Sequence, residues 1–442
     1  MLITPKQMTI EKLLNARKTP IEYTNCQLEA LNKVNIFLNS PEHFFLLAGY
    51  SGCGKTTIAE NIATATRSAL FAPTNAAVNR LKEKINNPQL QYSTIHSALF
   101  SAGTKNNTFF VDKSLKPNGI YIIDECSMID TYVLKIIIQE TLKNKCKIIF
   151  MGDSFQLEPV GENPFIFNWE KSNSDLFLEK NRCELKEVKR YDGSLLKIAT
   201  EIRINKKAKF NNPVVSDLTV VKKFSKNLAI DINNKSNYVV ITSTNNKRIQ
   251  YNEKIRAYSF RDREINHYAQ NGDKLVSVSN STNYANGEIF TINKGMLLYE
   301  FEIFVEKKDE SFKTYTALIY LHEQQLTILI PDLVESSMHG TQIFNSIQNN
   351  PESISQEAKN LIIAEKTLKN GEEIKYYKKA VNIATYGYAI SCHKAQGQEW
   401  DNVYIDAHWL MPVWDDAKWF YTAITRAKCK VEVTNNQYLK IN

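Results

Sequence analysis

One stretch constrains the fold of this chain more than any other. Residues 49–56 fit the phosphate-loop pattern G-x-x-x-x-G-K-[ST] at every fixed position. An apolar run at 44–48 predicts a buried strand before the loop, and residues 57–63 predict a helix after it. In this context the backbone N–H groups of the turn close round a phosphate at a helix N-terminus. The stretch therefore predicts a nucleoside-triphosphate site rather than a chance glycine-rich loop.

The loop and one residue upstream of it supply the first candidate site residues. We expect Lys55 to reach the outer phosphates and Thr56 to ligate Mg²⁺. Gln27 lies on a predicted helix that Thr24 caps, and its amide either pairs with an adenine or faces solvent. The residues expected to surround the nucleotide are Gln27, Gly49, Ser51, Gly52, Cys53, Gly54, Lys55, Thr56 and Thr57.

Composition limits the remaining possibilities. With 442 residues, the chain is long enough for two or more domains, and its 43% hydrophobic content is typical of globular proteins. A net charge of +8 is compatible with a polyanionic partner without proving one. The seven cysteines are scattered with no C-x-x-C pair, which indicates neither a zinc site nor a disulfide framework. No run approaches the length of a membrane span, so we expect no membrane partner and a cytoplasmic protein.

Polar residues follow predicted strands in the first third of the chain. A strand at 69–72 ends in a Pro-Thr-Asn segment, and a second polar cluster enters an apolar stretch near residue 95. Such residues suit contacts to a nucleic-acid backbone, but a plain turn and helix cap would look identical. The candidates are Pro73, Thr74, Asn75, Thr94 and His96.

A small hairpin is predicted between residues 100 and 116. Gly and Asn-Asn turn residues lie there between β-forming residues. Phe109 and Phe110 are either the hydrophobic seat of this hairpin or an exposed wedge.

Two further strand ends carry acidic and amide side chains. The strand at 120–123 runs into Asp124 and Glu125, where Asp124 would hold magnesium and Glu125 would accept a proton from the attacking water. The strand at 146–151 leads to Gln156, which can sense the terminal phosphate. The alternation of strands and helices predicts an α/β fold with a parallel, doubly wound sheet and a ligand at its carboxyl edge.

The order of these stretches resembles superfamily 1 helicases of the RecD/Dda type found in bacteria and phages, with the compact Dda-type layout nearest in size. The segment G-D-x-x-Q-L-x-P-V at 152–160 is the most specific link. Residues 386–400 and 420–427 resemble the fifth and sixth motifs of that family. The matching motifs span nearly the whole chain.

The resemblance implies further roles. Arg190 and Arg426 would reach the γ-phosphate from a second domain, where a rigid cation stabilises the charge of the transferring phosphoryl group. Gly397 and Glu399 would lie at the nucleotide, and Phe110, then Phe109, would be the pin that separates a duplex. Contacts to single-stranded DNA would come from the first-domain candidates above and from Ser391, His393 and Lys394.

We expect two RecA-like domains with two insertions. The first would span 20–184 with the hairpin at about 100–116, and the second would combine 185–265 with 381–442. Residues 266–380 would form an inserted β-rich accessory domain with a lysine-rich helical stretch at 352–379. The family resemblance implies that this insertion is SH3-like.

The sequence therefore predicts an ATP- and Mg²⁺-dependent DNA helicase that moves 5′-to-3′ on single-stranded DNA and opens duplex junctions. The direction is implied by the resemblance alone. An RNA helicase of the same superfamily, or a non-motor DNA-binding recombination accessory, is the alternative. We expect a monomer that works with replication or recombination proteins, in the host cytoplasm if a phage encodes it.

Overall fold

A computed structural model of the chain describes residues 8–17, 21–102, 109–111, 113–158, 179–187, 194–205, 217–221, 223–235, 237–261, 268–278, 284, 286–307, 310–323, 325–331, 354–367, 373–378, 381–407 and 416–434. The chain divides into two compact units. The first comprises Met1–Gly103, Thr108–Ala208 and Asp415–Thr425, and the second comprises Thr104–Asn107, Lys209–Trp414 and Arg426–Asn442.

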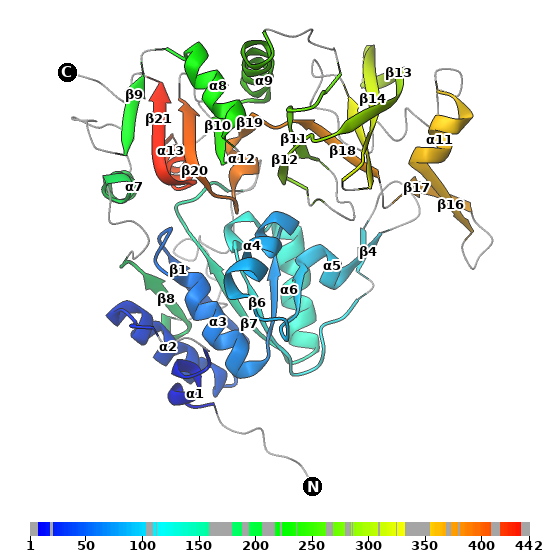
Figure 1. Ribbon diagram of the computed structural model, residues 1–442. Helices are drawn as coiled ribbons and strands as arrows, with labels where there is room; N and C mark the ends of the chain where they lie inside the picture. Colours follow the sequence, from blue (N-terminus) through cyan, green and yellow to red (C-terminus); the bar gives the residue numbers. More distant parts are fainter. Residues whose placement is uncertain are drawn as a thin grey trace. The chain divides into compact units, whose positions relative to one another are not determined.

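The first unit is built on a six-stranded sheet in the order β3-β2-β6-β7-β1-β8 (Figure 1). Each neighbouring pair is parallel, so the carboxyl ends of the strands lie at one edge. The parallel sheet predicted from the sequence is confirmed. The strands are β1 (Phe44–Gly49), β2 (Ala69–Ala72), β3 (Tyr92–Thr94), β6 (Ile120–Ile123), β7 (Lys147–Gly152) and β8 (Arg182–Leu185).

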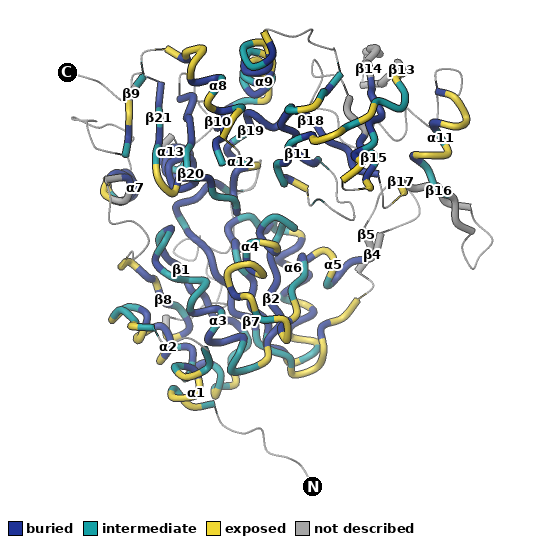
Figure 2. Tube along the Cα trace, in the orientation of Figure 1, coloured by how far each residue is buried: buried dark blue, intermediate teal, exposed yellow. Residues whose placement is uncertain are grey.

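Helices cover both faces of this sheet. Alternate side chains of β1 belong to two apolar clusters: Phe45 and Leu47 pack with α2, α3 and α4, whereas Phe44 and Leu46 pack with α5 and α6. All six residues of β1 are therefore buried (Figure 2), which explains the continuous apolar run at this place. The helices are α1 (Ile10–Leu14), α2 (Asn25–Leu38), α3 (Lys55–Thr66), α4 (Asn75–Ile85), α5 (Ile95–Leu99) and α6 (Thr131–Lys143).

The predicted hairpin is present in the first unit. β4 (Phe100–Ala102) and β5 (Phe109–Val111) pair antiparallel, with Ser101 opposite Phe110 and Ala102 opposite Phe109. The residues at its tip, 103–108, lie outside the described residues.

The first unit extends beyond the boundary expected after residue 184. β8 ends at Leu185 and pairs with β1, and α7 (Ser194–Asn205) follows it within the same unit. A segment from far downstream, α13 (Asp416–Ile424), also belongs to this unit. The sequence predicted both helices in the second domain, and this is wrong. The sequence of a helix does not indicate the sheet against which it packs.

The second unit contains another parallel sheet, in the order β19-β10-β20-β21-β9. Tyr238 and Val240 of β10 share an apolar cluster with α8 and α9. The second α/β fold expected from the sequence is thus present. Its elements are β9 (Leu218–Val221), α8 (Lys226–Asn234), β10 (Tyr238–Thr242), α9 (Asn245–Ser259), β19 (Ala389–Ser391), α12 (Cys392–Ala395), β20 (Trp400–Asp406) and β21 (Ala427–Thr434).

The inserted segment forms a separate six-stranded sheet in the order β12-β11-β18-β15-β14-β13. Its neighbours are antiparallel except for β15 and β18, which are parallel. β18 had been expected in the α/β domain, but it pairs with β11 and β15, and the α/β sheet resumes only at Ala389. The strands are β11 (Lys274–Ser277), β12 (Ile289–Thr291), β13 (Gly295–Lys307), β14 (Glu310–Leu321), β15 (Leu326–Pro331) and β18 (Val381–Tyr386).

The predicted helical stretch at 352–379 is largely wrong. Among the residues described in this range, only α11 (Gln356–Ile362) is helical, and β16 (Ile363–Thr367) then pairs antiparallel with β17 (Glu373–Tyr377). The sequence between these strands contains Asn370-Gly371, a dipeptide that favours tight hairpin turns over helix. None of the described helices is long and apolar enough to cross a bilayer.

Candidate nucleotide site

The phosphate loop lies between β1 and α3. Gly52 and Gly54 have φ angles of 80° and 86°, in a left-handed region of backbone conformation that residues other than glycine rarely adopt. α3 begins at Lys55, so the loop ends on the first amides of a helix, where anions are favoured. The Lys55 ammonium donates to the carbonyl oxygens of Gly49 and Tyr50, at 2.8 and 2.9 Å.

Gln27 packs directly against this loop. Its Nε2 donates to the carbonyl of Cys53 at 3.1 Å, and its Oε1 accepts from the amide of Thr24 as part of a capping box. A Cβ atom on Gly54 would lie 2.3 Å from Gln27 Nε2, so any larger residue here would push the Gln27 amide aside, in addition to straining the backbone. Gln27 is buried, which removes the solvent-exposed alternative of the sequence analysis; its adenine contact stays a prediction.

Asp124 and Glu125 follow the end of β6. Burial and the neighbouring Glu125 charge raise the pKa of Asp124 to about 6. Glu125 has a φ of 51°, and its carboxylate lies 3.6 Å from the guanidinium of Arg80. Arg80, on α4, was not singled out from the sequence, because a helical arginine is usually a surface residue.

β7 lies between β1 and β6 in the sheet, and it carries Gln156 beyond its end. Because the three strands are parallel, the phosphate loop, Gln156 and the Asp124–Glu125 pair follow neighbouring strand ends at one edge. Gln156 is 4% exposed, and its Oε1 has no partner among the described residues. A buried amide oxygen without a partner at this position fits a site that a ligand or water completes.

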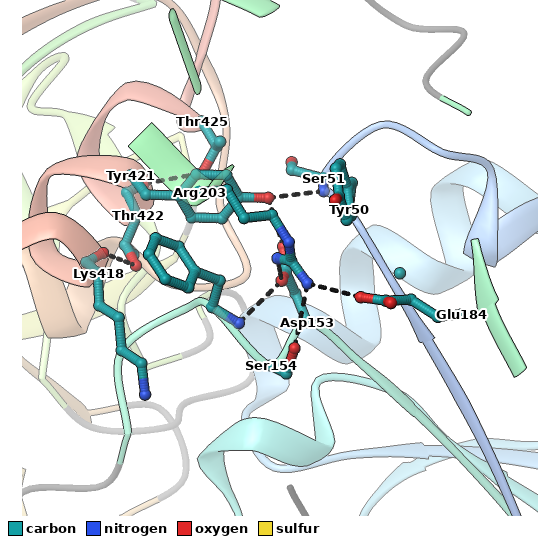
Figure 3. Close-up of polar contacts among 12 residues, drawn as sticks. Tyr50, Ser51, Asp153, Ser154, Glu184, Arg203, Lys418, Tyr421, Thr422 and Thr425 are labelled. Atoms are coloured by element: carbon teal, nitrogen blue, oxygen red, sulfur yellow. Dashed lines mark hydrogen bonds and ion pairs between the residues drawn. The ribbon is translucent and has the colours of Figure 1, made fainter. Parts of the chain in front are cut away.

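Asp153 is the first residue after β7 and lies three residues before Gln156. It is the centre of a buried polar cluster (Figure 3). It forms an ion pair with Arg203 of α7, and its Oδ2 accepts from the hydroxyl of Tyr421 of α13 at 2.7 Å. Burial alone would raise the pKa of Asp153, but the Arg203 charge and the Tyr421 bond outweigh it and lower the pKa. Arg203 also reaches Glu184 at 3.0 Å.

This cluster joins α13 to the phosphate loop. The amide of Ser51 donates to the Tyr421 hydroxyl at 3.1 Å, and the amide of Leu157 donates to Thr422 Oγ1 at 3.0 Å. Lys418 of the same helix forms an ion pair with Glu158 at 2.6 Å. None of these three α13 side chains was predicted to have a role, although Tyr421 and Thr422 lie in the segment 420–427 that resembles the sixth motif.

The residues proposed for DNA contact in the first unit lie at two adjacent strand ends. Ala72 of β2 pairs with Thr94 of β3, so the polar segments after both strands lie at the same edge. Thr74 and Thr94 are the N-caps of α4 and α5 and accept from the amides three residues on. His96 stacks on Phe100 with ring centroids 5.2 Å apart. The capping alternative therefore holds for both threonines, and Pro73 and Asn75 flank the first of them.

The corresponding residues of the second unit lie around α12. Ser391 is the N-cap of this helix, and burial lowers the pKa of His393. Lys394 is exposed. Gly397 follows with a φ of 76°, and Glu399 comes next but one.

Of the two arginines predicted to reach the γ-phosphate, the structure describes Arg426 but not Arg190. Arg426 belongs to the second unit, is 1% exposed, and donates to the carbonyl of Gln398 at 3.4 Å. Arg190 lies outside the described residues, as do Pro159 and Val160 of the quoted motif.

The described residues contain no group of three or more His, Cys, Asp or Glu side chains that could hold a metal ion. Mg²⁺ in phosphate sites takes few protein ligands and completes its shell with phosphate oxygens and water. Thr56 in the first turn of α3 and Asp124 at the end of β6 are a donor set of that kind.

Two family models match the chain in the order expected from its motifs. Residues 22–211 match an AAA domain, and residues 386–434 match a UvrD-like helicase C-terminal domain. The ATP-dependent DNA helicase dda of Enterobacteria phage T4 is 32% identical over 222 residues, and RecD of the RecBCD enzyme of Buchnera aphidicola is 30% identical over 252 residues. The chain is thus similar in sequence to helicases of the RecD/Dda type.

The match to these relatives is partial in length. It covers 47% and 51% of this chain, and 48% and 39% of the T4 and Buchnera proteins respectively. The chain thus matches about half, or less, of each of these two relatives. Among solved structures, a Pif1 helicase from Bacteroides in complex with ADP-AlF3 and single-stranded DNA is 17% identical, with a TM-score of 0.49 over 96% of this chain and 95% of that one.

Proposed function

We propose that the chain is an ATP-dependent DNA helicase that moves 5′-to-3′ on single-stranded DNA. One observation carries the ATP-hydrolysis part of the proposal, and the direction of movement rests on the family resemblance. Three neighbouring parallel strands, β1, β7 and β6, bring the phosphate loop, Gln156 and the Asp124–Glu125 pair to one edge of a sheet. A protein that only bound DNA would need none of these groups.

Each group has a chemical task in ATP hydrolysis. Lys55 exchanges its loop carbonyl partners for the outer phosphates, and the amides at the start of α3 bind phosphate oxygens. Thr56 and Asp124 would hold Mg²⁺, which supplies Lewis-acid stabilisation of phosphate charge when bound. Glu125 accepts a proton from the attacking water, and the amide nitrogen of Gln156 would donate to the terminal phosphate.

The second unit supplies the motor step in this proposal. Arg426 of the second unit would stabilise the charge of the transferring phosphoryl group, so that hydrolysis requires the two RecA-like domains to close. Arg190, which the sequence assigned to the second domain, falls within the first unit and would add its charge from there. Gly397 and Glu399 would line the nucleotide from that side. Repeated closure and opening would convert hydrolysis into movement along a strand.

Single-stranded DNA would be held through its backbone. The segments after β2 and β3 and the start of α12 present hydroxyl, imidazole and ammonium groups, which bind phosphates and stack on bases without reading sequence. Binding is therefore expected to depend strongly on salt and weakly on sequence. The β4–β5 hairpin would separate the duplex at a junction.

The test is ATP hydrolysis by the full chain, with and without single-stranded DNA, on the wild type, Lys55→Ala and Glu125→Gln. DNA should stimulate the wild type; Lys55→Ala should lose nucleotide binding and hydrolysis. Glu125→Gln should keep binding but lose about 10²- to 10⁴-fold in rate. Equal wild-type rates with and without DNA would exclude a motor. Stronger stimulation and unwinding with RNA of matched sequence would favour the RNA-helicase alternative.

A further inference from the structure

We propose that Tyr421 is a positioning residue of the nucleotide site. Its hydroxyl holds the phosphate loop and the turn that carries Gln156 (residues 153–156, the Gln156 turn) in the arrangement that hydrolysis requires. The inference rests on the proposed ATPase function and assigns a residue that lies far from the phosphate loop in the sequence.

The hydroxyl joins two segments that must act together. It accepts from the amide of Ser51, in the first half of the phosphate loop, at 3.1 Å. It donates to Oδ2 of Asp153, the first residue of the Gln156 turn, at 2.7 Å (Figure 3). Burial and the Asp153 charge raise the pKa of Tyr421 well above its usual range, so the hydroxyl stays protonated and remains a donor.

Asp153 passes this constraint to Gln156. Its Oδ1 accepts from the amide of Phe155 at 3.1 Å, and its carbonyl accepts from the amide of Gln156 at 3.2 Å. These bonds set the backbone of the Gln156 turn, and therefore the direction of the buried Gln156 side chain. Releasing Asp153 from one side would loosen the turn that presents this side chain.

The burial of Tyr421 indicates that it positions other groups and does not contact the nucleotide directly. Tyr421 is 1% exposed, Asp153 is 0% exposed and Ser51 is 9% exposed. The hydroxyl already uses its hydrogen on Asp153 and accepts from Ser51. Tyr421 is thus not placed to bind a nucleotide itself, and it acts through the two groups that it holds.

Arg203 supports the same arrangement from α7. Its guanidinium pairs with Asp153 and lies 4.1 Å from the ring centroid of Tyr50, the loop residue next to Ser51. The loop and the Gln156 turn are thus joined twice, by Tyr421 and by Arg203. Tyr421 is the better probe, because removing its hydroxyl leaves no buried charge without a partner.

Tyr421→Phe removes only the hydroxyl. The ring that packs edge-on against Phe155, with centroids 5.4 Å apart, is retained. The second unit offers a matched control, because Tyr388 also donates to a buried aspartate at 2.7 Å, and that aspartate, Asp273, also pairs with an arginine. Tyr388 lies in the segment that resembles the fifth motif, but the proposed function assigns no role to Tyr388, Asp273 or Arg256, so Tyr388→Phe makes the same chemical change outside the nucleotide site.

The experiment compares wild type, Tyr421→Phe and Tyr388→Phe in the full chain. Steady-state ATPase with single-stranded DNA gives kcat and KM, and calorimetry gives Kd for ADP and for an ATP analogue with a non-hydrolysable β–γ link. Thermal unfolding checks the fold. Tyr421→Phe should lower kcat, and the preference for the triphosphate over ADP, on the order of tenfold, with little change in ADP affinity. Tyr388→Phe should change stability alone.

Each outcome decides the inference. Wild-type kcat and nucleotide preference in Tyr421→Phe, the same losses in Tyr388→Phe, or a Tyr421→Phe chain that does not fold would overturn the positioning role. If the wild type binds both nucleotides but hydrolyses no ATP, the proposed function fails. The positioning role of Tyr421 is then tested only by whether Tyr421→Phe loses the preference for the triphosphate analogue over ADP. If the wild type binds neither nucleotide, both proposals fall.

Discussion

The side-chain amide of Gln27 donates to the carbonyl oxygen of Cys53, inside the phosphate loop, at 3.1 Å. The oxygen of the same amide accepts from the backbone of Thr24 at the start of α2. One side chain thus ties the beginning of a helix to the turn that would cradle phosphates. A base contact by Gln27 would have to use its second hydrogen or its second lone pair.

Gln27→Ala should weaken nucleotide binding beyond its effect on stability. The change removes both the cap bond and the loop bond, whereas Thr24→Ala removes its own side-chain cap and leaves the bond to Cys53 possible. Loss of a cap costs about 1 kcal/mol, so both variants should unfold more easily. Nucleotide affinity, measured by calorimetry, should fall clearly only in Gln27→Ala. Equal affinities in the two variants would mean that the loop bond is of no consequence for binding.

Phe110→Ala should abolish duplex unwinding while keeping DNA-stimulated ATP hydrolysis. Phe110 lies on β5 opposite Ser101, in the hairpin proposed to separate the strands. An unwinding assay on a forked duplex and an ATPase assay on single-stranded DNA check the two halves of this prediction. Phe109→Ala is the neighbouring control and should be milder. If Phe110→Ala loses both activities together, the residue belongs to the hydrophobic core instead.

Lys274 should make stability depend on pH above neutrality. It is 1% exposed and donates to three backbone carbonyls, those of Ile232, Lys235 and Tyr238. Burial lowers its pKa from 10.5 to about 8. Between these values the unfolded chain binds more protons than the folded one, so stability rises with pH, by up to about 1.4 kcal/mol per pH unit.

The Lys274→Met variant isolates this effect. Chemical denaturation of both chains between pH 7.5 and 10.5 measures the difference in their unfolding free energies. As the pH rises, the wild type should become more stable relative to Lys274→Met. Other groups titrate in this range, but they are common to both chains and cancel in the difference. Parallel pH profiles would show that the ammonium keeps its ordinary pKa in the folded chain.

Local patterns predicted much of the fold, because strands and helix starts carry their own marks. The apolar run of β1, the glycines of the loop and the capping threonine Thr24 each act within a few residues. Capping also explains Thr74 and Thr94, whose sequence allowed either a cap or a nucleic-acid contact. For Thr74 and Thr94 the sequence predicts the capping role, but it does not indicate whether the threonine hydroxyl has a second partner.

The rest depends on partners that no local pattern reveals. Asp153 was quoted within a motif, yet its partners Arg203 and Tyr421 lie 50 and 268 residues away. The sheet to which β18 belongs was mispredicted for the same reason, since all six of its residues are buried and a buried strand fits either sheet. The β16–β17 hairpin was missed for a different reason. Each of its strands carries one lysine and one glutamate, which also fits an exposed helix, whereas the dipeptide Asn370-Gly371 in the sequence favours a hairpin.

The position of α13 has a consequence for how the chain is made. The first unit takes in Asp415–Thr425, although Lys209–Trp414 belongs to the second. At roughly 5–20 residues per second, a ribosome needs about 10–40 s to synthesise the intervening segment. During that time the nascent first unit can pair Asp153 with Arg203 but has no tyrosine for the remaining bond. Its nucleotide site is thus completed only when most of the other unit has left the ribosome.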